Sequence, residues 1–257
     1  MSGLKKCPSC GSIDLILLDE STQQYKCDSC LKVFNLSKTS LSSSSVSSPV
    51  ESLSQTKRKI FFDKLMNKTV ELHAYFEKDV LAGTGFFISK DYILTNAHVV
   101  IKRSNANVPM EAAIQVTGNN YEKSKRFLFE LVAADNNLDI AILKLTEGSN
   151  EYVTFTQNMF NGEQVFAIGN SRGEGLCIVE GIVSDVSRIV DSNQFFMTSA
   201  IVTNGNSGCP VFSADGLLLG MITEGSKLSV AMNYAIPSSV LLEYIKKVER
   251  DEEIIIL

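Results

Sequence analysis

The sequence GTGFFISKDYILTNAHVV, residues 83–100, decides the expected fold of most of this chain. This stretch has an apolar run after two glycines, then a polar turn, then a second apolar run. Such an order is typical of two adjacent β-strands. His98 follows the second run directly, so its imidazole is expected at the end of a strand. The structural alternative is a buried core histidine that makes hydrogen bonds without taking part in chemistry.

Short apolar runs of this kind recur from about residue 58 to the end, with Gly, Asn, Asp and Ser between them. The further expected strands span residues 69–76, 113–118, 127–133, 139–145, 163–169, 176–184, 194–199, 217–223 and 230–236. So many strands with few long helices predict an all-β barrel or sandwich. A short helix is expected at residues 58–68, and a longer one at residues 239–250, with Ser238 or Ser239 as its N-cap.

Composition limits the function classes that need to be considered. The 257 residues are 44% hydrophobic and carry a formal net charge of −5, which excludes a general nucleic-acid coat. No apolar run approaches the length of a membrane span, and the N-terminal MSGLKKCPSC lacks the apolar core of a secretory signal. We therefore predict a protein without a membrane partner, located in the reducing cytoplasm.

Four cysteines near the N-terminus form two Cys-x-x-Cys pairs, Cys7 with Cys10 and Cys27 with Cys30, with sixteen residues between the pairs. Two such turns supply the four soft ligands that tetrahedral Zn²⁺ prefers. A redox pair and a coincidental cluster are the alternatives, but the helix that normally follows a redox pair is missing. We predict a zinc ribbon at residues 1–36, folded by its structural Zn²⁺, with a protein or nucleic-acid partner left open.

A serine-rich segment follows the cysteine pairs. Residues 37–57 contain ten serines and no periodic apolar pattern, which is typical of a flexible linker. The sequence therefore predicts three parts: a zinc ribbon at 1–36, a linker at 37–57, and one large domain at 58–257.

Three segments far apart in the sequence carry the candidate chemistry. Ser207 lies in the turn TNGNSGCP, residues 203–210, where glycines allow backbone N–H groups to converge on an oxyanion. His98 is a candidate base, because the only other histidine, His73, alternates with polar residues on a strand. Asp139 precedes the apolar run IAILKL, so its carboxylate should be partly buried and should need a partner. The alternative for Asp139 is an ordinary turn aspartate.

Together these segments resemble the trypsin/chymotrypsin clan, and most closely its HtrA-type branch. The resemblance rests on GTGFFISKDYILTNAHVV, DNNLDIAILKL, QVFAIGN, GIVSDVSR, GNSGCPVF and MNYAIPSS, and covers residues 68–248. It implies two six-stranded chymotrypsin-like β-barrels followed by a C-terminal helix. It also implies a catalytic triad of Ser207 as nucleophile, His98 as base, and Asp139 as the residue that orients the imidazole.

The same resemblance implies further site residues. The oxyanion hole is expected from the backbone of Gly205, Asn206 and Ser207. The substrate-binding positions are expected at Val202, Thr223, Glu224, Gly225 and Ser226. Three features depart from the family, one of which is that Ser199 and Asn204 differ from its common pattern. Cys209 stands where a second glycine is usual after the serine, and only twenty residues follow Pro237, which leaves no room for the usual PDZ domain.

These observations predict an intracellular serine endopeptidase that cleaves polypeptides through an acyl-enzyme and needs no catalytic cofactor. HtrA-type sites often rest in a misformed state, so a latent enzyme controlled by the zinc ribbon is included in this prediction. The alternative is an inactive protease-fold adaptor that binds peptides or partners, for which Cys209 is the best argument. The sequence leaves the oligomeric state open, a homo-oligomer included.

Overall fold

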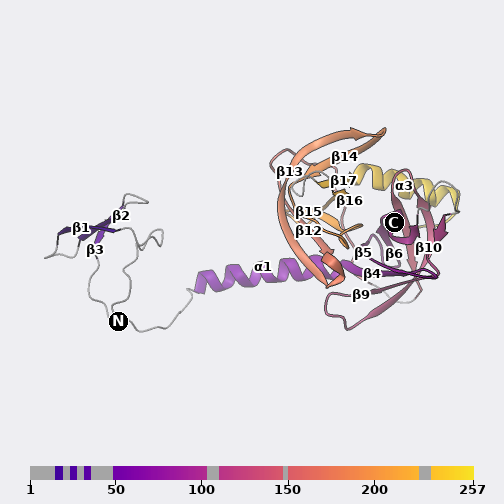
Figure 1. Cartoon of the computed structure of the whole chain (residues 1–257), viewed down its shortest axis with the longest axis horizontal. Helices are drawn as coiled ribbons and strands as arrows, with labels where there is room; N and C mark the ends of the chain where they lie inside the picture. Colours follow the sequence, from indigo (N-terminus) through magenta and orange to yellow (C-terminus); the bar gives the residue numbers. More distant parts are fainter. Residues whose placement is uncertain are drawn as a thin grey trace. The chain divides into compact units, whose positions relative to one another are not determined.

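The computed structural model describes residues 15–19, 24–27, 32–35, 49–102, 110–146, 150–225 and 233–257. The chain separates into two compact units, Met1–Ser52 and Leu53–Leu257. Figure 1 shows the course of the chain and the labels of its elements. Within the described residues, no helix has the length and apolar character that crossing a membrane requires.

The first unit contains a small antiparallel sheet in the order β1-β2-β3. Its strands are β1 (Leu15–Asp19), β2 (Gln24–Cys27) and β3 (Val33–Asn35). The described part of this unit buries little apolar area, because Ile16, Leu17 and Leu18 are all exposed. Such a sheet needs a further source of stability.

Helix α1 (Pro49–Asn67) is longer than the sequence pattern indicates. It begins at Pro49, within the expected serine-rich linker of residues 37–57, and the earlier linker residues 37–48 lie outside the described residues. The C-terminal half of α1 is held by aromatic packing, with the Phe62 ring 4.9 Å from that of Phe166. This contact orders a segment whose own sequence gives little helical signal.

The first group of strands in the second unit closes into a six-stranded sheet in the order β10-β11-β6-β5-β4-β9. Its members are β4 (Thr69–Tyr75), β5 (Val80–Phe87), β6 (Tyr92–Thr95), β9 (Gln115–Asn119), β10 (Arg126–Asp135) and β11 (Ile140–Leu145). Side chains such as Val70, Leu72, Phe87 and Leu143 alternate inward and fill it. Helix α2 (Ala97–Val100) and the short pair β7 (Ile101–Lys102) and β8 (Glu111–Ala112) extend from β6.

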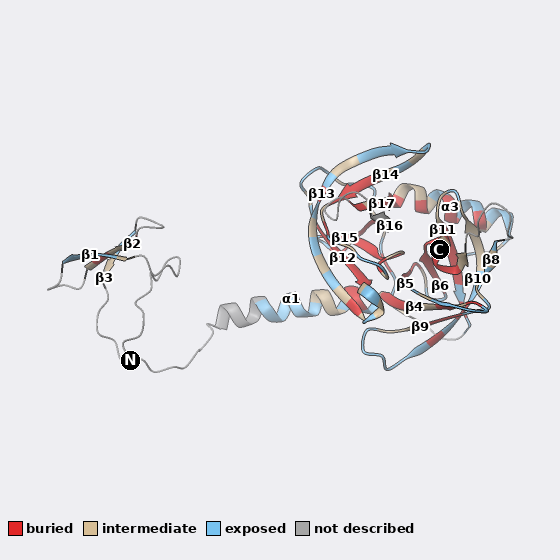
Figure 2. Cartoon of the chain, viewed as in Figure 1, coloured by how far each residue is buried: buried red, intermediate tan, exposed pale blue. Residues whose placement is uncertain are grey.

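A second closed six-stranded sheet follows, in the order β12-β13-β14-β17-β16-β15. It consists of β12 (Gln164–Asn170), β13 (Leu176–Val190), β14 (Asn193–Thr198), β15 (Pro210–Ser213), β16 (Leu218–Gly225) and β17 (Asn233–Pro237), with the 3₁₀ turn η1 (Ser171–Gly173) after β12. Strand β13 runs six residues past its expected end at 184, and the far end of the β13–β14 hairpin is exposed (Figure 2).

A shared apolar cluster joins the two barrels. It includes Phe86 and Ile142 from the first barrel, Ile168 and Phe212 from the second, and Leu241 from the C-terminal helix α3 (Ser238–Asp251). All five side chains are buried (Figure 2). The cluster therefore holds the barrels and the helix as one packed body, and the prediction of a mostly-β protein with few helices is confirmed.

Candidate active site

The turn that carries Ser207 precedes β15 and depends on two glycines with left-handed backbones. Gly205 has φ +92° and Gly208 has φ +82°. A Cβ at Gly205 would lie 2.1 Å from the Asn170 carbonyl oxygen, and one at Gly208 would lie 2.2 Å from the Thr84 carbonyl oxygen. Only glycine fits either position, because both the conformation and the space exclude a side chain.

His98 lies on α2 and is held by Asp139 from the start of β11. Its Nδ1 lies 2.8 Å from Asp139 Oδ2 and 3.0 Å from Oδ1, and its backbone N–H donates to Oδ1 over 3.0 Å. A carboxylate only accepts hydrogen bonds, so the Nδ1 proton faces Asp139 and Nε2 is left as the acceptor. This is the tautomer that a general base needs.

Asp139 itself sits in an unusual environment. Its backbone is left-handed, with φ +58°, at the end of a turn whose N–H groups at Asn137 and Leu138 donate to Asp135. Thr223 Oγ1 donates to its Oδ2 over 2.5 Å. Burial opposes ionisation of the carboxyl, but the hydrogen bonds from His98 and Thr223 outweigh it, and the pKa of Asp139 lies below its ordinary value.

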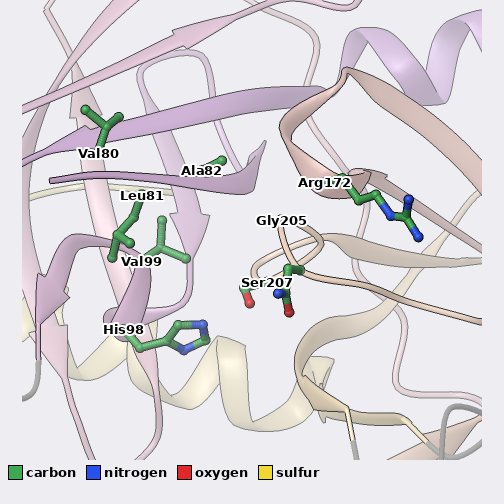
Figure 3. A pocket seen from close by; sticks show the side chains of 9 residues that line it. Val80, Leu81, Ala82, His98, Val99, Arg172, Gly205 and Ser207 are labelled. Carbon is green, nitrogen blue, oxygen red and sulfur yellow. The ribbon is translucent and has the colours of Figure 1, made fainter.

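A pocket of about 350 Å³ brings His98 and Ser207 together. Its lining consists of Val80, Leu81, Ala82, His98, Val99, Arg172, Asn204, Gly205 and Ser207. Figure 3 shows the imidazole of His98 on one side of this pocket and Ser207 on the other. Within the described residues no hydrogen bond joins the two side chains, a looser arrangement that is common in proteases without substrate.

The backbone around Ser207 is arranged to receive an oxyanion. The Asn204 carbonyl accepts from Arg172 N–H over 2.7 Å, and the Asn206 carbonyl accepts from Cys209 N–H over 2.9 Å. Because a peptide unit is planar and trans, these contacts direct the N–H groups of Gly205 and Ser207 the opposite way. In the described part of the chain, neither of these N–H groups donates to another protein atom.

The inclusion of Asn206 in the oxyanion hole was wrong. Its N–H donates to the Thr203 carbonyl over 3.0 Å, so the group is already engaged inside the turn. Its side chain is buried and accepts from Ser171 Oγ over 3.1 Å. Asn206 therefore supports the turn, and among the described residues of the predicted hole only the N–H groups of Gly205 and Ser207 remain without a protein acceptor.

Cys209 does not crowd the nucleophile. Its side chain is fully buried among the apolar residues of the second barrel. Its Cβ lies only 2.8 Å from the point that a Cβ on Gly169 would occupy, so it uses space that Gly169 leaves open. Burial, together with the neighbouring Cys177, raises the pKa of the Cys209 thiol, which therefore stays protonated.

The expected substrate-binding residues fall into different places. Val202 is half-buried against the second barrel, and Thr223 holds the Asp139 carboxylate. Glu224 and Gly225 continue β16, where Gly225 pairs with Asn233. The Glu224 side chain and the whole of Ser226 lie outside the described residues. Thr223 is thus a partner of the triad, a role that its sequence position alone did not suggest.

Several residues of the site were missed at the level of the sequence. Val80, Leu81 and Ala82 line the pocket from β5, and Thr84 on the same strand binds the nucleophile turn. A buried polar residue between two glycines was a local signal for Thr84. Arg172 acts through its backbone N–H, and nothing in its residue type indicates that role.

The predicted metal ligands can be followed only in part. Cys7, Cys10 and Cys30 lie outside the described residues, and Cys27 is buried at the end of β2. Among the residues whose placement is described, no group of three or more His, Cys, Asp or Glu side chains is arranged to hold a metal ion.

Comparisons with known proteins identify the family of this chain. Residues 83–221, which include His98, Asp139 and Ser207, match the trypsin-like peptidase domain family. A Chlamydia muridarum protein named "Probable periplasmic serine endoprotease DegP-like" is 27% identical, and the match covers 76% of this chain and 40% of that protein. The serine endoprotease DegS of Haemophilus influenzae is 30% identical, and the match covers 67% of this chain and 52% of that protein.

A solved structure of the serine endoprotease from Yersinia pestis superposes with a TM-score of 0.64 at 26% identity, over 76% of this chain and 67% of that one. The predicted chymotrypsin-like fold is therefore confirmed for the second unit. The chain spans only 40% of the DegP-like relatives from Chlamydia muridarum and Chlamydia pneumoniae.

The predicted cytoplasmic location is wrong, because these DegP-like relatives are named as periplasmic enzymes. The prediction relied on the missing apolar segment and on the paired cysteines, and neither feature belongs to the protease fold. Residues 83–221 do carry that fold, and with it the histidine, the aspartate and the serine in the order typical of the group. The chain belongs to the trypsin-like peptidase family, and its relatives place it among the HtrA- and DegP-like serine proteases.

Proposed function

We propose that this chain is a serine endopeptidase that cleaves polypeptides through a triad of Ser207, His98 and Asp139. The observation that carries the proposal is the pocket lined by both His98 and Ser207, with the His98 Nδ1 held 2.8 Å from Asp139. A histidine whose Nδ1 is held by a carboxylate, and whose Nε2 can accept a proton, is the arrangement that activates a serine hydroxyl.

The proposed reaction has two halves. Ser207 Oγ bonds to the peptide carbonyl carbon while its proton moves to His98 Nε2, and the carbonyl oxygen becomes an oxyanion facing the N–H groups of Gly205 and Ser207. The C–N bond then breaks, and His98 gives its proton to the leaving amine. A water molecule loses a proton to His98, attacks the acyl-enzyme, and releases the acid and the Ser207 hydroxyl.

Labelling by a fluorophosphonate probe tests this proposal on the full chain. The wild-type chain should be labelled at Ser207, and Ser207→Ala should abolish both labelling and peptide cleavage, because the attacking oxygen is gone. Ser89→Ala, in the turn between β5 and β6, is the matched control and should label like the wild type.

Failure to label, beside a trypsin control that does label, would contradict constitutive activity. Peptide binding without labelling would then favour the second candidate, an inactive adaptor. The buried position of Cys209 argues against that candidate, since its thiol leaves the nucleophile turn intact.

We also propose that the first unit is a zinc ribbon, in which Cys7, Cys10, Cys27 and Cys30 hold Zn²⁺. Two features of the described residues support this: Cys27 is fully buried at the end of β2, and its N–H donates to the Lys32 carbonyl over 2.9 Å. Bound zinc would supply folding energy there and no catalytic step. A chain lacking residues 1–48 would reveal regulation by the ribbon if its labelling rate differs from that of the full chain.

A further inference from the structure

Thr84 is a polar residue buried in the first barrel, with contacts that reach into the second. It lies on β5 and is fully buried. Its hydroxyl donates to the Gly205 carbonyl over 2.8 Å and accepts from the Asn170 N–H over 2.9 Å. Its own N–H donates to the Ser207 carbonyl over 2.9 Å. A single residue therefore holds the Gly205 and Ser207 carbonyls of the turn that carries Ser207 and, through the Asn170 N–H, the end of β12.

These contacts complete the restraint of the nucleophile turn. Arg172 N–H fixes the Asn204 carbonyl, and Cys209 N–H fixes the Asn206 carbonyl. Thr84 fixes the two remaining carbonyls, those of Gly205 and Ser207. Four consecutive peptide units are thus oriented, and Thr84 is the partner of two of them.

The Thr84 hydroxyl has a role that its backbone cannot fill. The Gly205 carbonyl has no other donor among the described residues, so without the hydroxyl the Gly205–Asn206 peptide keeps only the contact of the Asn206 N–H with the Thr203 carbonyl. Gly205 tolerates many backbone conformations, so a peptide held at its N–H end alone changes its orientation more easily. This peptide lies between the Gly205 N–H and the Ser207 N–H, so a change in its orientation would alter the angle between these two N–H groups.

We propose that Thr84 is a positioning residue that keeps the oxyanion hole formed from across the junction of the two barrels. The inference rests on the proposed function of Ser207. Thr84 does not line the pocket beside Ser207, so it acts through the turn and not by contact with the substrate.

The test compares two variants of Thr84 in the full chain. Thr84→Val keeps the volume and β-branching but leaves the Gly205 carbonyl and the Asn170 N–H without a partner. Thr84→Ser keeps the hydroxyl. Thr69→Val is the matched control: Thr69 is also buried in the first barrel, and its hydroxyl donates to the Leu65 carbonyl over 3.1 Å, away from the nucleophile turn.

The measurement is the rate of fluorophosphonate labelling as a function of probe concentration, which separates the maximal rate from the concentration for half-maximal rate. Thr84→Val should lower the maximal rate by about 10-fold to 100-fold, with the half-maximal concentration little changed. Thr84→Ser and Thr69→Val should stay within about threefold of the wild type, since both keep the hydroxyl contact at the turn.

Equal maximal rates for Thr84→Val and Thr69→Val, beside a wild type that labels, would overturn the inference and leave the proposed function standing. A wild-type chain that never labels would overturn both. If Thr84→Val does not fold, Thr84→Cys takes its place, because a thiol of similar size bonds weakly. Thr84→Cys should then label more slowly than Thr84→Ser, and equal rates would again count against the role of Thr84.

Discussion

At the scale of single residues, Asp139 must satisfy both an unusual backbone conformation and several hydrogen bonds. It combines a left-handed backbone with a carboxylate that accepts from the His98 ring, the His98 N–H and the Thr223 hydroxyl. Three hydrogen-bond donors to this partly buried carboxylate favour its ionised form, which agrees with the lowered pKa of Asp139. The negative charge of Asp139 therefore orients the His98 imidazole and also contributes to the stability of the fold.

Asp139→Asn should lower the labelling rate of Ser207 by about 10³-fold to 10⁴-fold, because an amide can turn its N–H₂ toward the ring and favour the wrong tautomer of His98. It should also flatten the pH dependence of stability. The folded pKa of Asp139 lies below its unfolded value, so the unfolded chain binds the proton first, and the wild type loses stability as the pH falls from about 5 through that folded pKa.

Urea unfolding midpoints between about pH 6 and pH 3 would check the second effect. Asp215→Asn, at an exposed carboxylate outside the site, is the control. A variant whose midpoint falls with pH as steeply as that of the wild type would contradict this account of Asp139.

His98, Asp139 and Ser207 could be selected as candidates from the sequence because each sits beside a local signal: a strand end, an apolar run, or a glycine turn. The contacts of Thr84 could not be predicted, although its place between two glycines is a local signal. The Thr84 hydroxyl and the Gly205 carbonyl are 121 residues apart in the sequence, and only the closure of two barrels brings them together. Asn206 was misassigned for a related reason, since its residue type does not reveal that its N–H is used inside the turn.

At the scale of elements, β15 and α3 illustrate what local patterns can and cannot predict. Strand β15 was missed because it has only four residues and begins with Pro210, which lacks an N–H donor. Helix α3 was expected from its apolar spacing, but neither serine caps it. Ser238 instead donates its hydroxyl to the Leu218 carbonyl over 2.7 Å, and so ties the start of the helix to β16.

Leu241→Ala should destabilise the second unit by about 3 kcal/mol, because Leu241 is fully buried in the shared apolar cluster and its removal leaves a cavity there. Leu242→Ala is the matched control on the same helix, where the side chain is only half-buried and outside that cluster, and it should cost less than about 1 kcal/mol. The free energy of unfolding of both variants, measured by chemical denaturation, would check this prediction. Equal losses would mean that α3 does not dock through the face that Leu241 occupies.

At the scale of the whole molecule, the chain contains two units that differ in how they are stabilised. The second unit has three apolar clusters, whereas the described strands of the first unit expose most of their apolar residues. Composition predicted that the large domain begins at residue 58, whereas the two compact units divide between Ser52 and Leu53, and the sequence placed the start of α1 too late. Serine-rich sequence has low helix propensity, and the packing of Phe62 on Phe166 could not be seen in it.

If the first unit is the proposed zinc ribbon, removal of zinc by a chelator should unfold it and leave the second unit folded, because the proposed metal site lies in the first unit. A thermal scan of the full chain should then lose one transition and keep the other, and zinc analysis should give about one ion per chain before treatment. Cys27→Ser should reproduce the loss, whereas Cys177→Ser, in β13, should keep the metal. A chain that contains no zinc, or a scan that the chelator does not alter, would contradict the ribbon.

The placement of His98 on one barrel and Ser207 on the other has a further consequence. The distance between the His98 imidazole and the Ser207 hydroxyl depends on how the two closed barrels pack against the apolar cluster that they share. An offset of about 1 Å between reacting groups can slow catalysis about a hundredfold. Substitutions in this buried cluster, far from any substrate, can therefore change the rate of the proposed reaction while His98, Asp139 and Ser207 stay the same.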